Sequence, residues 1–114
     1  MSWSSRSNIL PFAALSLWSG VVLAADVCPA RAPHVLRYVD VFDGPPEQLA
    51  TLVPDVTHPQ SGSWELGYVY DAGRIVTFRC KYDDGKQIDV KLAHRVEKCS
   101  YARNSKQELK VSCR

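Results

Sequence analysis

Four cysteines constrain the fold of this chain more than any other feature: Cys28, Cys80, Cys99 and Cys113. An even number of cysteines in a short exported chain predicts a framework of disulfide bonds. A zinc site is the alternative, but zinc ligands usually come in closely spaced pairs, and here even Cys99 and Cys113 are far apart. Two disulfides are therefore favoured, and four cysteines allow three ways of pairing them.

The strands expected near the C-terminus favour one of these pairings. Residues 97–103 and 108–113 are typical of two strands joined by a turn at 104–107. Folding this hairpin back on itself brings Cys99 close to Cys113 and leaves the other two cysteines to tie the start of the chain to the sheet. The favoured pairing is Cys28–Cys80 and Cys99–Cys113.

The first 25 residues have the layout of a secretory signal peptide. A short polar start with one charge, Arg6, is followed by the uncharged apolar run 9–24, which ends in small residues. An uncleaved membrane anchor is the alternative. The run is shorter than the about 20 residues that a spanning helix needs, and Pro11 and Gly20 interrupt it. We expect cleavage near Ala25 or Asp26.

The mature chain is expected to be one small periplasmic domain, residues 26–114, and not a lipoprotein. The residues before Cys28, Asp26 and Val27, do not offer the small residue that lipidation requires. About 90 residues suffice for one small core. The formal net charge is +2 and includes Arg6 of the leader. A chain so close to neutral gives no reason to expect nucleic acid or an anionic membrane surface as a partner.

The first half of the mature chain predicts a strand, a short helix and a loop. Residues 34–42 are rich in β-forming residues. The turn 43–47 can open a helix whose stripe is Leu49, Leu52 and Val53, and Pro54 limits it to about two turns. Residues 55–63 are expected to form a flexible polar loop.

The second half has a period of two, which is typical of antiparallel strands. Strands are expected at 64–70, 75–82 and 87–92, with a hairpin at Asp84-Gly85 between the last two. Together with the C-terminal hairpin, this predicts an α+β fold that is mostly β. We expect a small antiparallel sheet or meander of five or six strands, one short helix and two disulfides.

The sequence shows no catalytic motif, so we expect no enzyme, no metal and no cofactor. The histidines at 34, 58 and 94 have no ligand spacing between them. Asp83 and Asp84 form a pair of carboxylates, but residues at a hairpin tip normally point to solvent.

Two surfaces are candidates for binding a partner. One is the outer face of the 75–82 strand, with tyrosines of the preceding strand nearby, although an ordinary charged sheet face is the favoured explanation of this pattern. The other is the polar loop, although most such loops only connect strands. The candidate residues are His58, Gln60, Ser61, Ser63, Tyr68, Tyr70, Arg79 and Lys81.

Several motifs together resemble a known family. They are C-P at 28–29, F-D-G-P-P-E-Q-L-A at 42–50, L-V-P-D at 52–55 and R-C-K-Y at 79–82. This pattern resembles a family of small exported, disulfide-containing proteins of Gram-negative bacteria that carries only a locus-tag name. The resemblance implies a periplasmic domain with two disulfides, and no catalytic residue carries over from it. The chain departs from the pattern after Tyr82, where an aliphatic or small residue is expected.

A second resemblance suggests a class of function. The segment F-R-C-K-Y-D-D-G-K at 78–86 is similar to a segment of the periplasmic inhibitors of c-type lysozyme. Those small β-barrels insert a loop containing Ser-Gly into the acidic cleft of the enzyme. Here the Ser-Gly pair, at 61–62, precedes the cysteine strand instead of following it, so the likeness is an analogy.

These observations leave two hypotheses for the function. The first is a periplasmic protein-binding domain, an inhibitor or immunity protein that blocks a cell-wall hydrolase or a delivered toxin by steric occlusion. Either residues 56–63 or the face of Arg79 and Lys81 would make the contact. The alternative is a non-enzymatic accessory or assembly protein of the envelope. In both, the partner is another protein, with no nucleic acid and no stable membrane insertion after cleavage.

Overall fold

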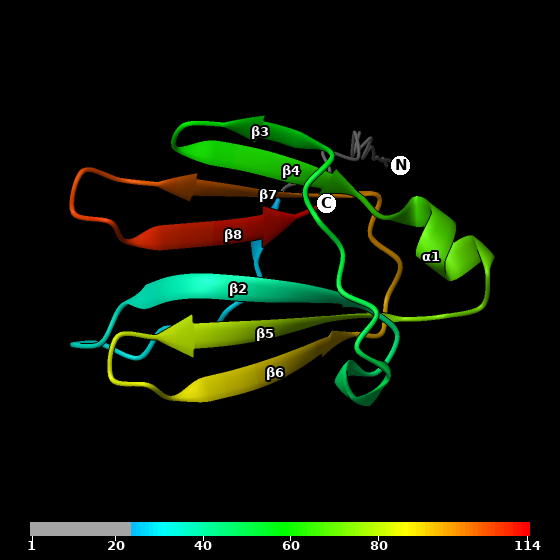
Figure 1. The fold of residues 1–114 in the computed structure, drawn as a ribbon, viewed down its shortest axis with the longest axis horizontal. Helices are drawn as coiled ribbons and strands as arrows, with labels where there is room; N and C mark the ends of the chain where they lie inside the picture. The colour runs from blue at the N-terminus through cyan, green and yellow to red at the C-terminus, as the bar shows by residue number, and fades with distance from the viewer. Residues whose placement is uncertain (1–23) are drawn as a thin grey trace, which may run out of the picture.

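A computed structural model describes residues 24–114, which form two antiparallel sheets (Figure 1). The expected signal peptide lies almost wholly outside the described residues. The five-stranded sheet has the order β1 (Ala25–Asp26), β8 (Leu109–Cys113), β7 (Lys98–Arg103), β4 (Ser61–Glu65) and β3 (Val56–His58). The three-stranded sheet has the order β2 (Leu36–Asp43), β5 (Val76–Tyr82) and β6 (Gln87–Leu92). Residues 24–114 also contain one short α-helix, α1 (Gly67–Asp71), and one 3-10 turn, η1 (Pro46–Gln48).

The predicted class is confirmed: the protein is mostly β, with one short helix and two disulfides. The described residues contain more strands than the five or six expected. Two of them, β1 and β3, are only 2 and 3 residues long, too short for the sequence pattern to indicate them. The two sheets meet where β2 lies beside β8, and the chain crosses from one sheet to the other between η1 and β3 (Figure 1).

The core lies between the sheets. Alternate residues of β5, Val76, Phe78 and Cys80, are fully buried. The edge of the Trp64 ring packs against Phe78, with 5.8 Å between the ring centroids. The predicted alternation of β5 and its pairing with β6 are thus confirmed, since Arg79 lies opposite Asp89 in the observed register.

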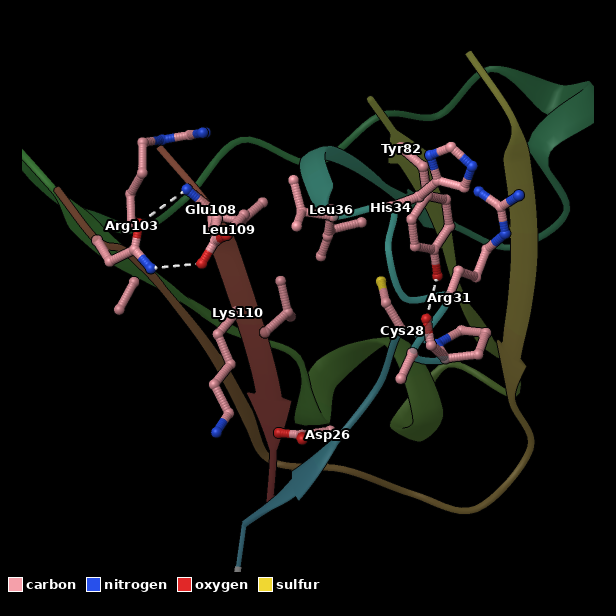
Figure 2. A pocket seen from close by; sticks show the side chains of 16 residues that line it. Asp26, Cys28, Arg31, His34, Leu36, Tyr82, Arg103, Glu108, Leu109 and Lys110 are labelled. Atoms are coloured by element: carbon pink, nitrogen blue, oxygen red, sulfur yellow. Dashed lines mark hydrogen bonds between the residues drawn. The ribbon is translucent and has the colours of Figure 1, made fainter. Parts of the chain in front are cut away.

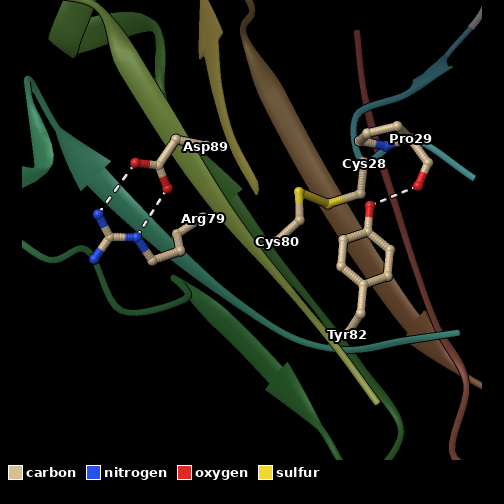
Figure 3. The surroundings of a disulfide bond; sticks show 6 residues. All are labelled: Cys28, Pro29, Arg79, Cys80, Tyr82 and Asp89. Atoms are coloured by element: carbon tan, nitrogen blue, oxygen red, sulfur yellow. Dashed lines mark hydrogen bonds and ion pairs between the residues drawn. A yellow bond between two sulfur atoms is a disulfide. The ribbon is translucent and has the colours of Figure 1, made fainter. Parts of the chain in front are cut away.

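Both disulfides have the pairing that the sequence favoured. Cys99 lies directly opposite Cys113 on the neighbouring strands β7 and β8. Cys28 bonds to Cys80, which fastens the N-terminal segment to β5 (Figure 3). The hydroxyl of Tyr82 donates to the Pro29 carbonyl at 2.5 Å, beside this bond.

The predicted strand over 64–70 is wrong. β4 ends at Glu65, and Gly67 begins the helix α1. The buried residues are Leu66 and Val69, which have the i, i+3 spacing of a helix. At this bend the Leu66 N–H donates to the carbonyl of Glu97 at 2.9 Å, so a residue distant in sequence holds the chain here.

The predicted helix after Asp43 is also wrong. Only the turn η1 forms, and Leu49 ends it in a left-handed conformation with φ of 56°. The chain then runs along β2, where the N–H of Leu52 donates to the Val41 carbonyl at 2.7 Å. This pairing replaces the helix because it satisfies the backbone at the edge of the sheet.

Residues 55–63 are not a loop but largely a β-hairpin. β3 pairs with β4, so that Val56 lies opposite Ser63 and His58 opposite Ser61. The hairpin packs on β7, where Gly62 leaves room for the Tyr101 ring. A polar segment therefore forms the exposed edge of the five-stranded sheet.

Candidate functional site

The β3–β4 hairpin exposes only part of the predicted contact set. His58 and Gln60 are exposed, and Ser61 is half-buried. Ser63 is only 7% exposed, because it lies in the middle of β4 between the strands on either side. The prediction of Ser63 as a surface contact is therefore wrong.

Three aliphatic side chains project from the segment that leads into this hairpin. Leu49 is 77% exposed, Val53 is 78% exposed and Val56 is 46% exposed. We call these three residues the exposed strip. Sequence reasoning missed the strip, because it placed Leu49 and Val53 on the core-facing side of a helix. Single exposed aliphatics are common, but three within eight residues concentrate apolar surface in one segment.

The segment that carries the strip is held firmly on both sides. Arg74 bonds to Asp43 before η1 through Nε at 2.5 Å and Nη2 at 2.9 Å. The Leu52 carbonyl accepts the indole N–H of Trp64 at 3.3 Å. Asp55 accepts the backbone N–H of Glu65 at 2.6 Å. Exposed apolar residues are thus presented on a backbone that the rest of the molecule fixes.

A small cavity of about 250 Å³ lies beside the strip, between the two sheets. Val53, Trp64, Tyr38 and Tyr101 are among the residues that line it. The guanidinium of Arg103 lies over the ring of Tyr38, 5.4 Å from its centroid. Val53 of the exposed strip therefore borders a concave, partly aromatic surface.

The second predicted surface is largely neutralised by ion pairs. Arg79 forms two hydrogen bonds with Asp89, at 2.8 and 3.1 Å (Figure 3). Lys81 Nζ lies 2.7 Å from Asp40 Oδ2. The guanidinium lowers the pKa of Asp89, so the carboxylate stays charged. These cations serve first to pair with carboxylates of neighbouring strands.

The structure does not bring the tyrosines to this face. Tyr68 and Tyr70 lie on α1, beyond the ends of the strands (Figure 1). Tyr68 is 53% exposed. The hydroxyl of Tyr70 donates to the Leu92 carbonyl at 2.8 Å, so this side chain links α1 to the end of β6. The predicted grouping of these tyrosines with Arg79 and Lys81 is wrong.

A charged cluster joins the N-terminal segment to the β5–β6 hairpin. Arg31 forms two hydrogen bonds with Asp84, at 2.9 and 3.0 Å. His34 Nδ1 lies 3.1 Å from Asp83 Oδ1. The two aspartates were expected to point to solvent, but they fasten the segment that follows Cys28. The guanidinium holds the pKa of Asp84 well below its usual range.

This cluster is poorly suited to a metal ion. One ligand atom from each of His34, Asp83 and Asp84 lies within 4.8 Å of the others. Both oxygens of Asp84 already bond to Arg31, which carries a fixed positive charge at the place where a cation would bind.

The cavity beside the cluster has a volume of about 500 Å³ (Figure 2). Arg31 and His34 lie on one side of it, Lys110 and Arg103 lie on the other, and Leu36 and Leu109 lie between them. These residues come from the two sheets and the N-terminal segment, so the cavity marks the junction of all three.

A comparison of the chain with models of known protein families identifies the class to which it belongs. Residues 30–114 match the family model described as the Type VI secretion system Tli immunity protein. The chain belongs to this family. The match spans nearly all of the described residues and includes both candidate contact surfaces, while β1 and Cys28 lie before it. No curated protein and no solved structure gives a significant match to the chain.

The immunity family also agrees with the expected resemblance to small disulfide-containing proteins. Membership implies a protein partner, and the two disulfides fit an oxidising compartment. Among residues 24–114, no helix is long and apolar enough to cross a membrane.

Proposed function

We propose that this protein is a periplasmic immunity protein that binds a toxin delivered by type VI secretion and blocks it by steric occlusion. The observation that carries the proposal is the family match over residues 30–114. The protein works as a rigid binding surface and not as an enzyme. Its target is a toxin that acts in the envelope, of which a cell-wall hydrolase is one class.

The proposal includes export, with cleavage near Ala25 or Asp26. Ala25 pairs with Cys113, and Asp26 pairs with Ser112, at the edge of the five-stranded sheet. A chain that begins at Ala25 keeps both of these pairs. Export also supplies the oxidising conditions that the two disulfides need.

The exposed strip, together with His58 and Gln60 at the tip of the hairpin, supplies the proposed contact surface. Apolar side chains gain most from burial against a partner, and polar groups at the rim add specificity. The bonds that hold the segment keep the ordering cost of binding low. The Arg79 and Lys81 face is less suited, because its cations already have carboxylate partners.

The test is capture of the toxin by the exported protein. The wild type should retain the toxin of a competing strain and form a stable one-to-one complex with the purified toxin in size-exclusion chromatography. The double variant Val53→Asp, Val56→Asp should lose the complex, since it places two charges in the apolar contact.

Tyr68→Asp is the matched control, because it introduces the same charge at an exposed apolar residue on α1. It should bind like the wild type. Loss of binding in this control alone would move the contact surface to α1. A wild type that binds no delivered toxin, and only resident envelope proteins, would support the assembly-factor alternative instead.

A further inference from the structure

The strand β6 has an open edge. It is the last strand of the three-stranded sheet and pairs only with β5 (Figure 1). It is 6 residues long, whereas the other terminal strands β1 and β3 have 2 and 3 residues, and the chain after η1 covers part of β2. Its register with β5 is continuous, and it contains no proline. Natural edge strands usually carry a bulge, a proline, a cover or charged side chains against pairing with other chains, and of these β6 has only the charges of Asp89 and Lys91, which are opposite in sign.

The backbone groups on this edge can be assigned from the hydrogen-bond pattern. The N–H of Tyr82 donates to the Lys86 carbonyl at 3.0 Å, and the register continues with Cys80 opposite Ile88. In an antiparallel pair, bonded and non-bonded residues alternate, so Ile88 and every second residue after it bond to β5. The residues whose backbone groups point to the open edge are Gln87, Asp89 and Lys91.

The side chains on this strand divide by face. Ile88, Val90 and Leu92 pack partly against the core. Asp89 and Lys91 are exposed on the outer face. Asp89 bonds to Arg79, but a carboxylate can accept up to about four hydrogen bonds. Within the described part of the chain, Lys91 has no ion-pair partner.

We propose that β6 pairs antiparallel with β6 of a second copy of this chain and joins two three-stranded sheets into one of six strands. In the register centred on Val90, Asp89 of each copy lies opposite Lys91 of the other. The backbone groups of both residues point to the open edge. The pairs that form the hydrogen bonds between the two copies are therefore also the pairs that bring opposite charges together. The apolar residues also match, with Ile88 opposite Leu92 and Val90 opposite its own copy.

The neighbouring registers are unfavourable, which makes the pairing specific. Moving the register by one pair in either direction places Asp89 opposite Asp89, or Lys91 opposite Lys91, at the two-fold axis. Like charges directly opposite each other destabilise a strand pair. The Lys91 carbonyl accepts the N–H of Ala93 at 3.1 Å, and its second lone pair remains for the partner strand.

The test is the association state of the protein purified from the periplasm after export of the full-length chain. Sedimentation velocity should show a concentration-dependent dimer that weakens with added salt. Lys91→Glu and Asp89→Lys should each lower the association constant about tenfold or more, because two-fold symmetry repeats each repulsion. An equimolar mixture of the two variants should dimerise again, since each restores the charge that the other lacks.

Lys106→Glu in the β7–β8 turn makes the same charge change on the other sheet and should leave the dimer intact. Amide exchange supplies a second readout: the N–H groups of Asp89 and Lys91 should become protected as the concentration rises. The recovery in the mixture also shows that the variants fold. A wild type that stays monomeric, or a dimer that neither charge reversal weakens, would overturn the proposal.

Discussion

Arg31 and Asp84 show how single ion pairs fix the N-terminal segment after Cys28. Arg31 bonds to both oxygens of Asp84, and its guanidinium also lies 4.7 Å from the centroid of the Tyr82 ring. These contacts hold the residues that follow Cys28, whereas β1 precedes it. At this scale, charged residues that sequence reasoning assigned to solvent act as fasteners of the fold.

These ion pairs predict a loss of stability in acid. Arg31 lowers the pKa of Asp84, and hydrogen bonds from Arg95 lower the pKa of Asp71 and Glu97. A carboxylate whose pKa is lower in the folded state stabilises that state above the pKa of the unfolded chain, about 4. The urea midpoint should therefore fall as the pH falls below about 4.

Asp84→Asn is the variant that checks this account. Removing the carboxylate should weaken the acid dependence of the urea midpoint and lower stability at neutral pH. Equal slopes of midpoint against pH for the variant and the wild type would show that the Arg31–Asp84 pair does not contribute.

Gly62 is a second residue whose identity the packing dictates. A Cβ atom there would lie 2.5 Å from Cε1 of Tyr101 and 2.7 Å from the carbonyl oxygen of Val56. Gly62→Ala should cost about 1–3 kcal/mol of unfolding free energy, measured by urea denaturation, because the backbone oxygen cannot move aside. Ser61→Ala, at the neighbouring half-buried position, should change stability by about 0.5 kcal/mol or less. Equal effects of the two substitutions would contradict the close contact.

Among the elements, the two disulfides differ in the length of chain that each one closes. Cys28–Cys80 joins residues 52 apart, and Cys99–Cys113 joins residues 14 apart on paired strands. In the chain-entropy model these contribute about 4 and about 3 kcal/mol. The longer bond also joins the N-terminal segment to the three-stranded sheet, beside the bonds of Arg31 to Asp84 and of Tyr82 to Pro29.

Replacing each pair with alanine should therefore destabilise the protein unequally. Cys28→Ala, Cys80→Ala should lower the free energy of unfolding by about 1 kcal/mol more than Cys99→Ala, Cys113→Ala. Thermal or urea unfolding of the two double variants makes the comparison. A larger loss from the C-terminal pair would indicate that packing around the bond, and not loop closure, governs its contribution.

The elements that the sequence predicted correctly are those specified by local signals. The Asp84-Gly85 turn, with the alternation of apolar and polar residues on either side of it, is sufficient to predict the β5–β6 hairpin. The C-terminal hairpin likewise places Cys99 opposite Cys113. The errors arise where tertiary contacts decide. The chain turns into α1 after Leu66, whose N–H donates to the Glu97 carbonyl, although Trp64 to Tyr70 alternate like a strand.

The candidate site was predicted less well, for the same reason. Leu49, Leu52 and Val53 have helical spacing, but Leu52 pairs with Val41 on β2 and the other two side chains are left exposed. No local sequence pattern indicates the pairing of Leu52 with Val41. His58 and Gln60 were identified correctly as exposed, because polarity alone indicates the surface.

At the scale of the whole molecule, the two sheets support separate surfaces. Val56 and the hairpin tip lie at the edge of the five-stranded sheet, within the proposed toxin contact, whereas Leu49 directly follows η1, whose residues line a cavity together with Asp89 and Lys91. The open edge of β6 lies at the far side of the three-stranded sheet (Figure 1). A dimer through β6 would therefore leave Val56 and the hairpin tip of each copy free to bind a toxin.

The most direct test of the account is the survival of recipient cells attacked by a strain that delivers the toxin. Recipients that export the wild type should survive, and recipients that export Val53→Asp, Val56→Asp at equal abundance should be killed like cells without the protein. Tyr68→Asp should protect like the wild type. Equal protection by the strip variant, or no protection by the wild type, would contradict the proposal that this protein confers immunity through the exposed strip.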